Sequence, residues 1–90
     1  DQYQNAINDN TKAIQIGDSN DAVAYTYRGD SYYVLGQYQN AINDYTKAIQ
    51  LVPNHDYAYN WRGISYRALG QSTLADADKA KACSLDSQYC

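Results

Sequence analysis

Apolar residues recur at helical spacing along this chain, in segments separated by short breaks that are rich in polar residues, glycine or proline. The clearest stripe lies in residues 38–51, where Tyr38, Ala41, Ile42, Tyr45, Ala48, Ile49 and Leu51 share one face. The same pattern predicts helices over residues 2–16, 22–35, 38–51, 56–69 and 72–85. Because the breaks between them are short, we expect an all-α fold of five antiparallel helices.

The breaks carry signals for helix ends. In residues 17–21, glycine is expected to stop the first helix, and Ser19, Asn20 and Asp21 are candidate N-caps for the second. Gly36 is expected to end the second helix in the left-handed conformation. Pro53 cannot continue a helix and disfavours helical geometry at the residue before it.

The predicted helices are copies of one unit of 34 residues. Residues 22–55 match residues 56–89 when the sequence is shifted by 34 positions, and residues 37–50 match residues 2–15 with one mismatch. A repeat of this period predicts a linear stack of small helical units. We expect a single domain over 1–90, in which 1–21 is the second half of a unit, 22–55 is a complete unit, and 56–90 is a complete C-terminal unit with a capping helix and a tail.

The last predicted helix differs from its equivalent in the preceding unit, because its outer face is polar. A terminal unit of a stacked array must expose one side to water, so this difference indicates a cap. The replacements are Ser72 for Tyr38, Asp76 for Ile42 and Lys79 for Tyr45.

Two pairs of equivalent residues do not fit a simple apolar packing face. Gly29 and Gly63 lie inside helices, where glycine costs about 1 kcal/mol relative to alanine, so they predict the close approach of another helix. Arg28 and Arg62 lie beside them, and a charge on a packing face requires a partner. We expect ion pairs, which could be bidentate, with the aspartates 16 residues further on, namely Arg28–Asp44 and Arg62–Asp78.

Charge and composition narrow the class of function. A net charge of −3 with no Lys/Arg cluster argues against nucleic acid and against anionic lipid surfaces as partners. No apolar run is long enough for membrane insertion, and no signal peptide is recognisable. The sequence leaves the compartment open, cytoplasmic or extracytoplasmic.

No residue pattern is typical of a catalytic or metal site. His55 lies in a Pro-Asn-His-Asp turn, where a solvated loop residue is the simplest interpretation, and one cysteine pair with a distant histidine is short of a four-ligand zinc set. All ten acidic residues are aspartates scattered over polar faces and caps, and the glycines punctuate helices and do not form a phosphate loop. We therefore expect no enzymatic activity, no cofactor and no metal.

The spacing of aromatic and small residues resembles the tetratricopeptide repeat, whose pattern is W-x2-L-G-x2-Y, then A-x3-F, then P. The matches are Tyr25-x2-Arg28-Gly29-x2-Tyr32, Ala41-x3-Tyr45 and Pro53 in one unit, and Tyr59-x2-Arg62-Gly63-x2-Tyr66 and Ala75 in the next. Lys79 and Ser87 depart from the pattern, because they occupy the slots of the second aromatic residue and the proline. The resemblance implies a right-handed α–α superhelix whose concave surface, lined by the first helix of each unit, binds a peptide or a partner protein.

Helical geometry selects the residues of this concave face. The selected set is Thr26, Tyr27, Asp30, Tyr33, Tyr57, Asn60, Trp61, Ile64 and Arg67. Tyr27 and Trp61 are 34 residues apart and are expected side by side as interface anchors, although Trp61 could instead pack between adjacent units. Some family members hold a C-terminal carboxylate here with Lys, Asn and Arg, but those slots carry other residues in this chain. We expect aromatic and apolar contacts, with Asp30 and Arg67 adding polarity.

Cys83 and Cys90 present open alternatives. Within one continuous helix they would lie about 10.5 Å apart, too far for a disulfide, but a helix that ends near Leu85 would let the tail fold back. This segment also resembles the repeat ends of Sel1-like proteins, where such a bridge staples a helix pair. The alternatives are two free thiols or a redox pair, whereas a disulfide would favour an extracytoplasmic location.

The leading hypothesis for function is a non-catalytic scaffold that binds a peptide or partner protein. A second hypothesis is self-assembly through helix 2–16, with Tyr3, Ile7 and Ile14 open to another copy. A third is the regulatory arm of a larger protein.

Overall fold

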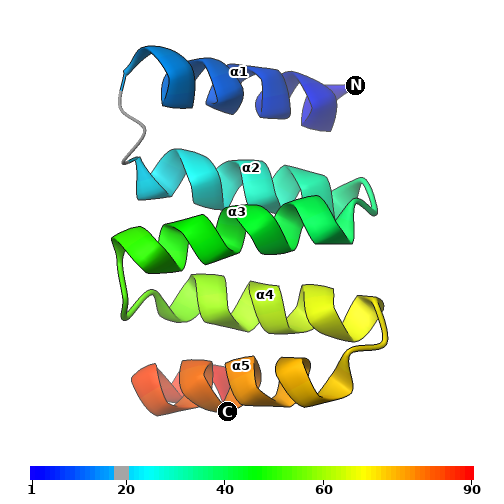
Figure 1. Cartoon of the computed structure of the whole chain (residues 1–90), viewed down its shortest axis with the longest axis vertical. Coiled ribbons are helices and arrows are strands. Elements are labelled where there is room, and N and C mark those ends of the chain that lie inside the picture. The colour runs from blue at the N-terminus through cyan, green and yellow to red at the C-terminus, as the bar shows by residue number, and fades with distance from the viewer. Residues whose placement is uncertain (18–20) are drawn as a thin grey trace.

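A computed structural model describes residues 1–17 and 21–90, and within these ranges it contains helices and no strand. The helices lie side by side in chain order, each antiparallel to the next, in a body of 35 × 24 × 18 Å (Figure 1). The all-α fold is confirmed, with five main helices over residues 1–17 and 21–90. The elements are α1 (Gln2–Ile16), α2 (Ala22–Val34), α3 (Tyr38–Leu51), α4 (Asp56–Ala68), α5 (Ser72–Leu85) and the short 3-10 helix η1 (Ser87–Tyr89).

Helices α2 and α4 each end one residue earlier than predicted, at a glycine turn. Gly36 has a φ of +77°, as predicted, and Gly70 has a φ of +78°. After α2, the N–H of Gln37 donates to the carbonyl of Tyr32 at 2.8 Å and the N–H of Gly36 donates to that of Tyr33 at 3.0 Å. This pattern satisfies the last carbonyls of the helix and reverses the chain within each unit.

The start of α2 is capped as predicted. The Asp21 carboxylate accepts a hydrogen bond from the N–H of Ala24 at 3.0 Å. Ser19 and Asn20, the other two candidates for this cap, lie outside the described residues. At the end of α3, Val52 is extended with φ −132° and ψ 90°, as the following Pro53 requires.

The core lies where α3 meets α2 and α4. It is built from Ala41, Tyr45, Ala48 and Ala58, all with no exposed surface. The predicted close approaches are confirmed: a Cβ atom at Gly29 would lie 3.0 Å from the ring of Tyr45, and one at Gly63 would lie 3.1 Å from the carbonyl oxygen of Ala75. Only glycine lets the paired helices come this near.

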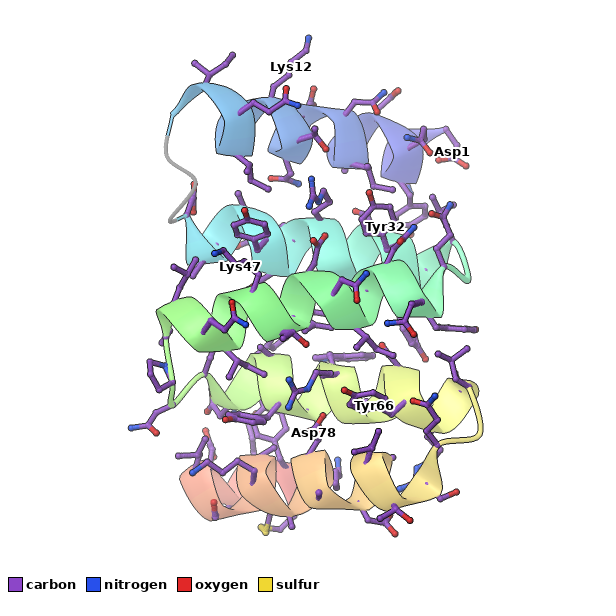
Figure 2. All side chains as sticks on the ribbon, in the orientation of Figure 1. Asp1, Lys12, Tyr32, Lys47, Tyr66 and Asp78 are labelled. Atoms are coloured by element: carbon purple, nitrogen blue, oxygen red, sulfur yellow. A yellow bond between two sulfur atoms is a disulfide. The ribbon has the colours of Figure 1, made fainter. Side chains whose placement is uncertain are left out.

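Both predicted ion pairs are confirmed, and both are bidentate. Arg28 contacts Asp44 through Nε–Oδ2 and Nη2–Oδ1, each at 2.8 Å. Arg62 contacts Asp78 in the same way, at 2.7 and 2.8 Å. Figure 2 shows Asp78 on the side of α5 that faces α4. Each pair therefore joins the two helices of one unit.

The arginines also reach the preceding unit. Nη1 of Arg28 donates to the hydroxyl of Thr11 at 3.1 Å, and Nη1 of Arg62 donates to that of Thr46 at 3.2 Å. Each guanidinium carbon lies 5.4–5.8 Å from two tyrosine ring centroids, in the range of cation–π contact. We call each assembly of arginine, aspartate, threonine and two tyrosines an arginine clamp. The tyrosines are Tyr25 and Tyr32 in the first clamp and Tyr59 and Tyr66 in the second, with Tyr32 and Tyr66 labelled in Figure 2.

The first helix is less open than the sequence suggests. Ile7 was expected to be open to another copy, but it is only 4% exposed, so this expectation is wrong. The reason is that α1 packs on α2 as α3 packs on α4, and Ile7 holds the place of Ile42, which is also 4% exposed. Tyr3 is 36% exposed and Ile14 is half-buried.

The outer side of α5 is polar, as predicted, because Ser72, Asp76 and Lys79 are all exposed. None of the helices within residues 1–17 and 21–90 combines the length and the apolar character that crossing a membrane requires.

Candidate functional site

Two adjoining hollows open between α2 and α4, the first helices of the two complete units. The aromatic hollow, with a volume of about 320 Å³, is lined by Asp30, Tyr33, Val34, Tyr45, Tyr57 and Trp61. The histidine hollow, of about 300 Å³, is lined by Val23, Thr26, Tyr27, His55 and Tyr57. Tyr57 lines both, so the two hollows adjoin at this side chain, and together we call them the α2–α4 groove.

Helical spacing explains how α2 supplies one wall of the groove. Its lining residues Val23, Tyr27, Asp30 and Val34 are four, three and four positions apart and therefore share one face. Three of them are apolar or aromatic and more than half exposed: Val23 at 59%, Tyr27 at 58% and Val34 at 55%. This wall thus offers an accessible apolar surface.

Asp30 is the only charged side chain among the described residues that line the aromatic hollow. Its two carboxylate oxygens accept hydrogen bonds from the hydroxyls of Tyr45, at 2.5 Å, and Tyr57, at 2.9 Å. Burial raises the pKa of the Asp30 carboxyl, and the two tyrosine hydroxyls oppose this shift by donating to the charged form. Asp30 therefore ties together α2, α3 and α4 at the floor of the groove.

Both tyrosine partners of Asp30 have a raised pKa. Burial is the main cause that raises the pKa of Tyr45 and Tyr57, and the hydrogen bonds to Asp30 add to it. These hydroxyls remain donors at neutral pH, which keeps the Asp30 carboxylate in a fixed orientation.

We call the contact of Asp30 with Tyr45 and Tyr57 the acidic junction, and it occurs in one unit only. In the next unit, Ile64 occupies the position of Asp30 and Lys79 occupies that of Tyr45. The Lys79 ammonium donates to the side-chain oxygen of Asn60 at 2.8 Å, so a different polar contact replaces the tyrosine–aspartate bond. The arginine clamps repeat, but the acidic junction does not.

Trp61 borders the aromatic hollow and also packs between the two units. It lines the aromatic hollow, and its ring packs edge-on against Tyr33 of the preceding unit, with centroids 5.4 Å apart. It also meets Tyr57 at 6.1 Å. The recorded ring partners of Trp61 are thus Tyr33 and Tyr57, whereas Tyr27, its expected neighbour, lines the histidine hollow.

The groove gathers only part of the residue set chosen from the sequence. Asn60, Ile64 and Arg67 line neither hollow. Asn60 is only 6% exposed and accepts a hydrogen bond from Lys79 of α5. Arg67 pairs with Asp76 of α5 at 2.6 Å on the surface. Asn60 is thus a buried residue, whereas Arg67 is exposed but outside the hollows.

Thr26 lines the histidine hollow but is 6% exposed, so it is not an open-face residue either. Its hydroxyl donates to the carbonyl of Ala22 at 2.7 Å, which uses its proton inside the helix. A side chain at the edge of the buried sector cannot be assigned from helical spacing alone.

His55 is a structural residue, and its interpretation as a solvated loop residue is wrong. Its Nδ1 accepts the N–H of Ala58 at 3.4 Å and so caps α4, while its Nε2 lies 3.2 Å from the hydroxyl of Thr26. Because the Thr26 proton is already given to Ala22, Nε2 must be the donor in this contact. The two contacts are those of an imidazole that accepts at Nδ1 and donates from Nε2.

The C-terminal tail folds back onto α5, which ends at Leu85. Cys83 and Cys90 are joined by a disulfide, with Cα atoms 4.6 Å apart, and η1 lies between them. Within residues 1–17 and 21–90, no group of three or more His, Cys, Asp or Glu side chains is placed to hold a metal ion.

Comparison with known proteins gives one consistent family. The sequence profile described as "TPR repeat", the tetratricopeptide repeat, matches residues 29–70. The TPR domain of Arabidopsis OM64 is 31% identical, with a TM-score of 0.92 over 97% of this chain and 71% of that one. The search of curated proteins found no match.

Two further solved structures similar to this chain contain bound partners. The first TPR of Spaghetti (RPAP3), bound to the HSP90 peptide SRMEEVD, is 28% identical, with a TM-score of 0.91 over 94% of this chain and 67% of that one. The TPR2B domain of yeast Sti1, in a pHsp70 complex, is 26% identical, with a TM-score of 0.89 over 97% of this chain and 69% of that one.

Proposed function

The chain belongs to the tetratricopeptide repeat family, and from this we propose that it is a non-catalytic interaction module that binds a peptide segment of a partner protein in the α2–α4 groove. The observation that supports the groove as the site is the pair of hollows that share Tyr57 between the first helices of the two units. Their walls offer aromatic rings and exposed valines to a ligand.

The similar structures support peptide binding as the activity. One of them holds the HSP90 peptide SRMEEVD and another is a complex with pHsp70. We do not carry those partners over to this chain. The HSP90 peptide contains three acidic residues, whereas the groove here presents the carboxylate of Asp30, which would repel an acidic ligand.

The anchors of the proposed site are Tyr27, Tyr57 and Trp61. Aromatic side chains dominate the binding energy of protein interfaces, and truncation of a central one typically costs about 2 kcal/mol or more. Trp61 is held in place by Tyr33 and Tyr57, so little conformational freedom is lost when a ligand packs against it.

A peptide selection tests this proposal. Peptides selected from a random display library on the immobilised protein would be measured by fluorescence anisotropy against the unaltered protein and Trp61→Ala. We expect the substitution to weaken binding by about 30-fold, the equivalent of 2 kcal/mol.

Leu74→Ala is the matched control, because Leu74 is an apolar residue on α5 that is 50% exposed and lies outside the groove. We expect this variant to bind as the unaltered protein does. Circular dichroism would establish that both variants are folded. Unchanged affinity in a folded Trp61→Ala variant would contradict the site.

A further inference from the structure

The lining of the aromatic hollow points to the chemistry of the ligand. We propose that this hollow receives the positively charged side chain of a basic residue in the bound peptide, between the Asp30 carboxylate and the rings of Tyr33, Tyr57 and Trp61. This inference rests on the proposed function and specifies the partner as a basic peptide.

The hollow contains both groups that recognise a cation. Asp30 supplies a negative charge, and four aromatic side chains surround it: Tyr33, Tyr45, Tyr57 and Trp61. Aromatic faces attract ammonium and guanidinium groups, most strongly those of tryptophan and tyrosine. No basic side chain is among the described residues that line the hollow, so the charge of Asp30 is not neutralised there.

The chain itself shows how these groups hold a cation. In the first arginine clamp, Arg28 is bound by the Asp44 carboxylate and lies 5.6 and 5.8 Å from the rings of Tyr25 and Tyr32. The aromatic hollow has the same components, a carboxylate with tyrosine rings beside it, but lacks the arginine. A basic side chain from a partner would complete the same arrangement.

The geometry around Asp30 suits an ionised carboxylate. Both of its oxygens accept a tyrosine hydroxyl proton, whereas a protonated acid would have to donate from one of them. Each carboxylate oxygen can accept more than one hydrogen bond, so the tyrosines leave acceptor capacity for a ligand. The two hydroxyls fix the carboxylate before a ligand arrives, which lowers the ordering cost of binding.

The neighbouring unit provides the internal comparison. At the equivalent positions it has Ile64 in place of Asp30 and Lys79 in place of Tyr45, and the positive charge of Lys79 would repel a basic ligand. The acidic aromatic junction is therefore specific to the groove and is not a requirement of the repeat.

The test uses Trp61 as its probe, since it is the single tryptophan of the chain. Three capped pentapeptides, with arginine, citrulline or glutamate at the centre and glycine elsewhere, would be titrated to about 10 mM while tryptophan fluorescence is recorded. Citrulline has nearly the shape of arginine without its charge. We expect the arginine peptide to bind at least about 10-fold more tightly than the citrulline peptide, and the glutamate peptide to be the weakest.

Two variants that each remove one negative charge assign the effect to Asp30. Asp30→Asn should reduce the affinity for the arginine peptide by about 10-fold and abolish the preference over citrulline. Asp9→Asn, on the exposed surface of α1, should change neither. If Asp30→Asn does not fold, the comparison of the arginine and citrulline peptides on the unaltered protein is sufficient to decide whether the hollow prefers a cation.

The proposal is overturned if the arginine peptide gives no response, if it binds no more tightly than citrulline, or if a folded Asp30→Asn variant behaves as the unaltered protein does. These outcomes are distinct from failure of the proposed function. Library peptides that lack basic residues but still depend on Trp61 would retain the groove as a binding site while removing its preference for a cation.

Discussion

Arg28 and Arg62 show how a charge can occupy the packing face of a repeat. A buried ion pair seldom stabilises a fold by itself, because desolvation offsets the attraction. Here each guanidinium contacts a carboxylate, a threonine hydroxyl and two tyrosine rings. Arginine suits this place better than lysine, because its planar fork matches the carboxylate and stacks on rings.

Loss of one partner from a clamp should be costly. We expect Arg28→Ala to lower the free energy of unfolding by about 3 to 5 kcal/mol, since it leaves the Asp44 carboxylate, 6% exposed, without its partner. Asp44→Ala should cost less, because the Arg28 side chain is 18% exposed and can be partly hydrated. In a double-mutant cycle measured by urea unfolding, the coupling energy should be about 2 kcal/mol.

The exposed pair Arg67–Asp76 is the control for this cycle. Its side chains are 57% and 72% exposed, so the same cycle should give a coupling of at most about 0.5 kcal/mol. A coupling of zero within error for Arg28 and Asp44 would remove the clamp as a source of stability.

At the scale of helices, the units differ in how each helix begins. Helices α3 and α5 start after glycine turns with no side-chain cap, whereas α1, α2 and α4 start with Asp1, Asp21 and His55 as caps. His55 is the unusual member, because its second nitrogen reaches Thr26 on α2. It therefore joins the start of α4 to α2 at one end of the groove.

Replacement of His55 tests this role. His55→Ala should lower the free energy of unfolding by about 1 to 2 kcal/mol through loss of the cap and of the contact with Thr26. His55→Asn should recover roughly half of this loss, because asparagine caps helices well but is too short to reach Thr26. Chemical unfolding would measure both. Equal stability of His55→Ala and the unaltered protein would exclude a structural role.

The helices were predictable because their signals are local. Periodicity, Gly36, Asp21 and Pro53 each act within one turn, and the observed ends differ from the expected ones by a single residue. The Arg–Asp pairs could also be predicted, since two copies of the unit place the same charges at the same separation.

The groove was only partly predictable. Tyr27, Asp30, Tyr33, Tyr57 and Trp61 line the hollows, and helical spacing places all five on the expected faces of α2 and α4. Asn60 and Arg67 line neither hollow, because Asn60 accepts a hydrogen bond from Lys79 and Arg67 pairs with Asp76, both on α5. Tyr45 and His55 were missed because only the tertiary contacts show that one is the floor of the hollow and the other joins two helices.

For the molecule as a whole, the arginine clamps link the stack from α1 to α5, and the disulfide joins the tail to α5. Each clamp holds a helix to both of its neighbours, so the stack is expected to unfold cooperatively. The C-terminal tail is held instead by the Cys83–Cys90 disulfide, which a reductant can break.

Reduction of the disulfide should free the C-terminal tail and lower the free energy of unfolding. Closure of a loop between residues seven positions apart is worth about 2 to 3 kcal/mol in the chain-entropy description. We expect unfolding in reductant to show a loss of this order, with no titratable thiol in the unreduced protein. A variant with both Cys83→Ser and Cys90→Ser should be insensitive to reductant. Two free thiols in the unreduced protein would contradict the bond.

The arginine clamp allows the array to be lengthened by duplication of a unit. A tandem copy of residues 22–55 inserted after His55 would bring its own arginine to Thr46 and its own aspartate to that arginine, so every new junction would find its contacts ready. The copy would not create a second complete aromatic hollow, because Val23 and Tyr27 would stand where Tyr57 and Trp61 stand now. Duplication could thus lengthen the array while recognition stays at one boundary, and natural selection could change either property without disturbing the other.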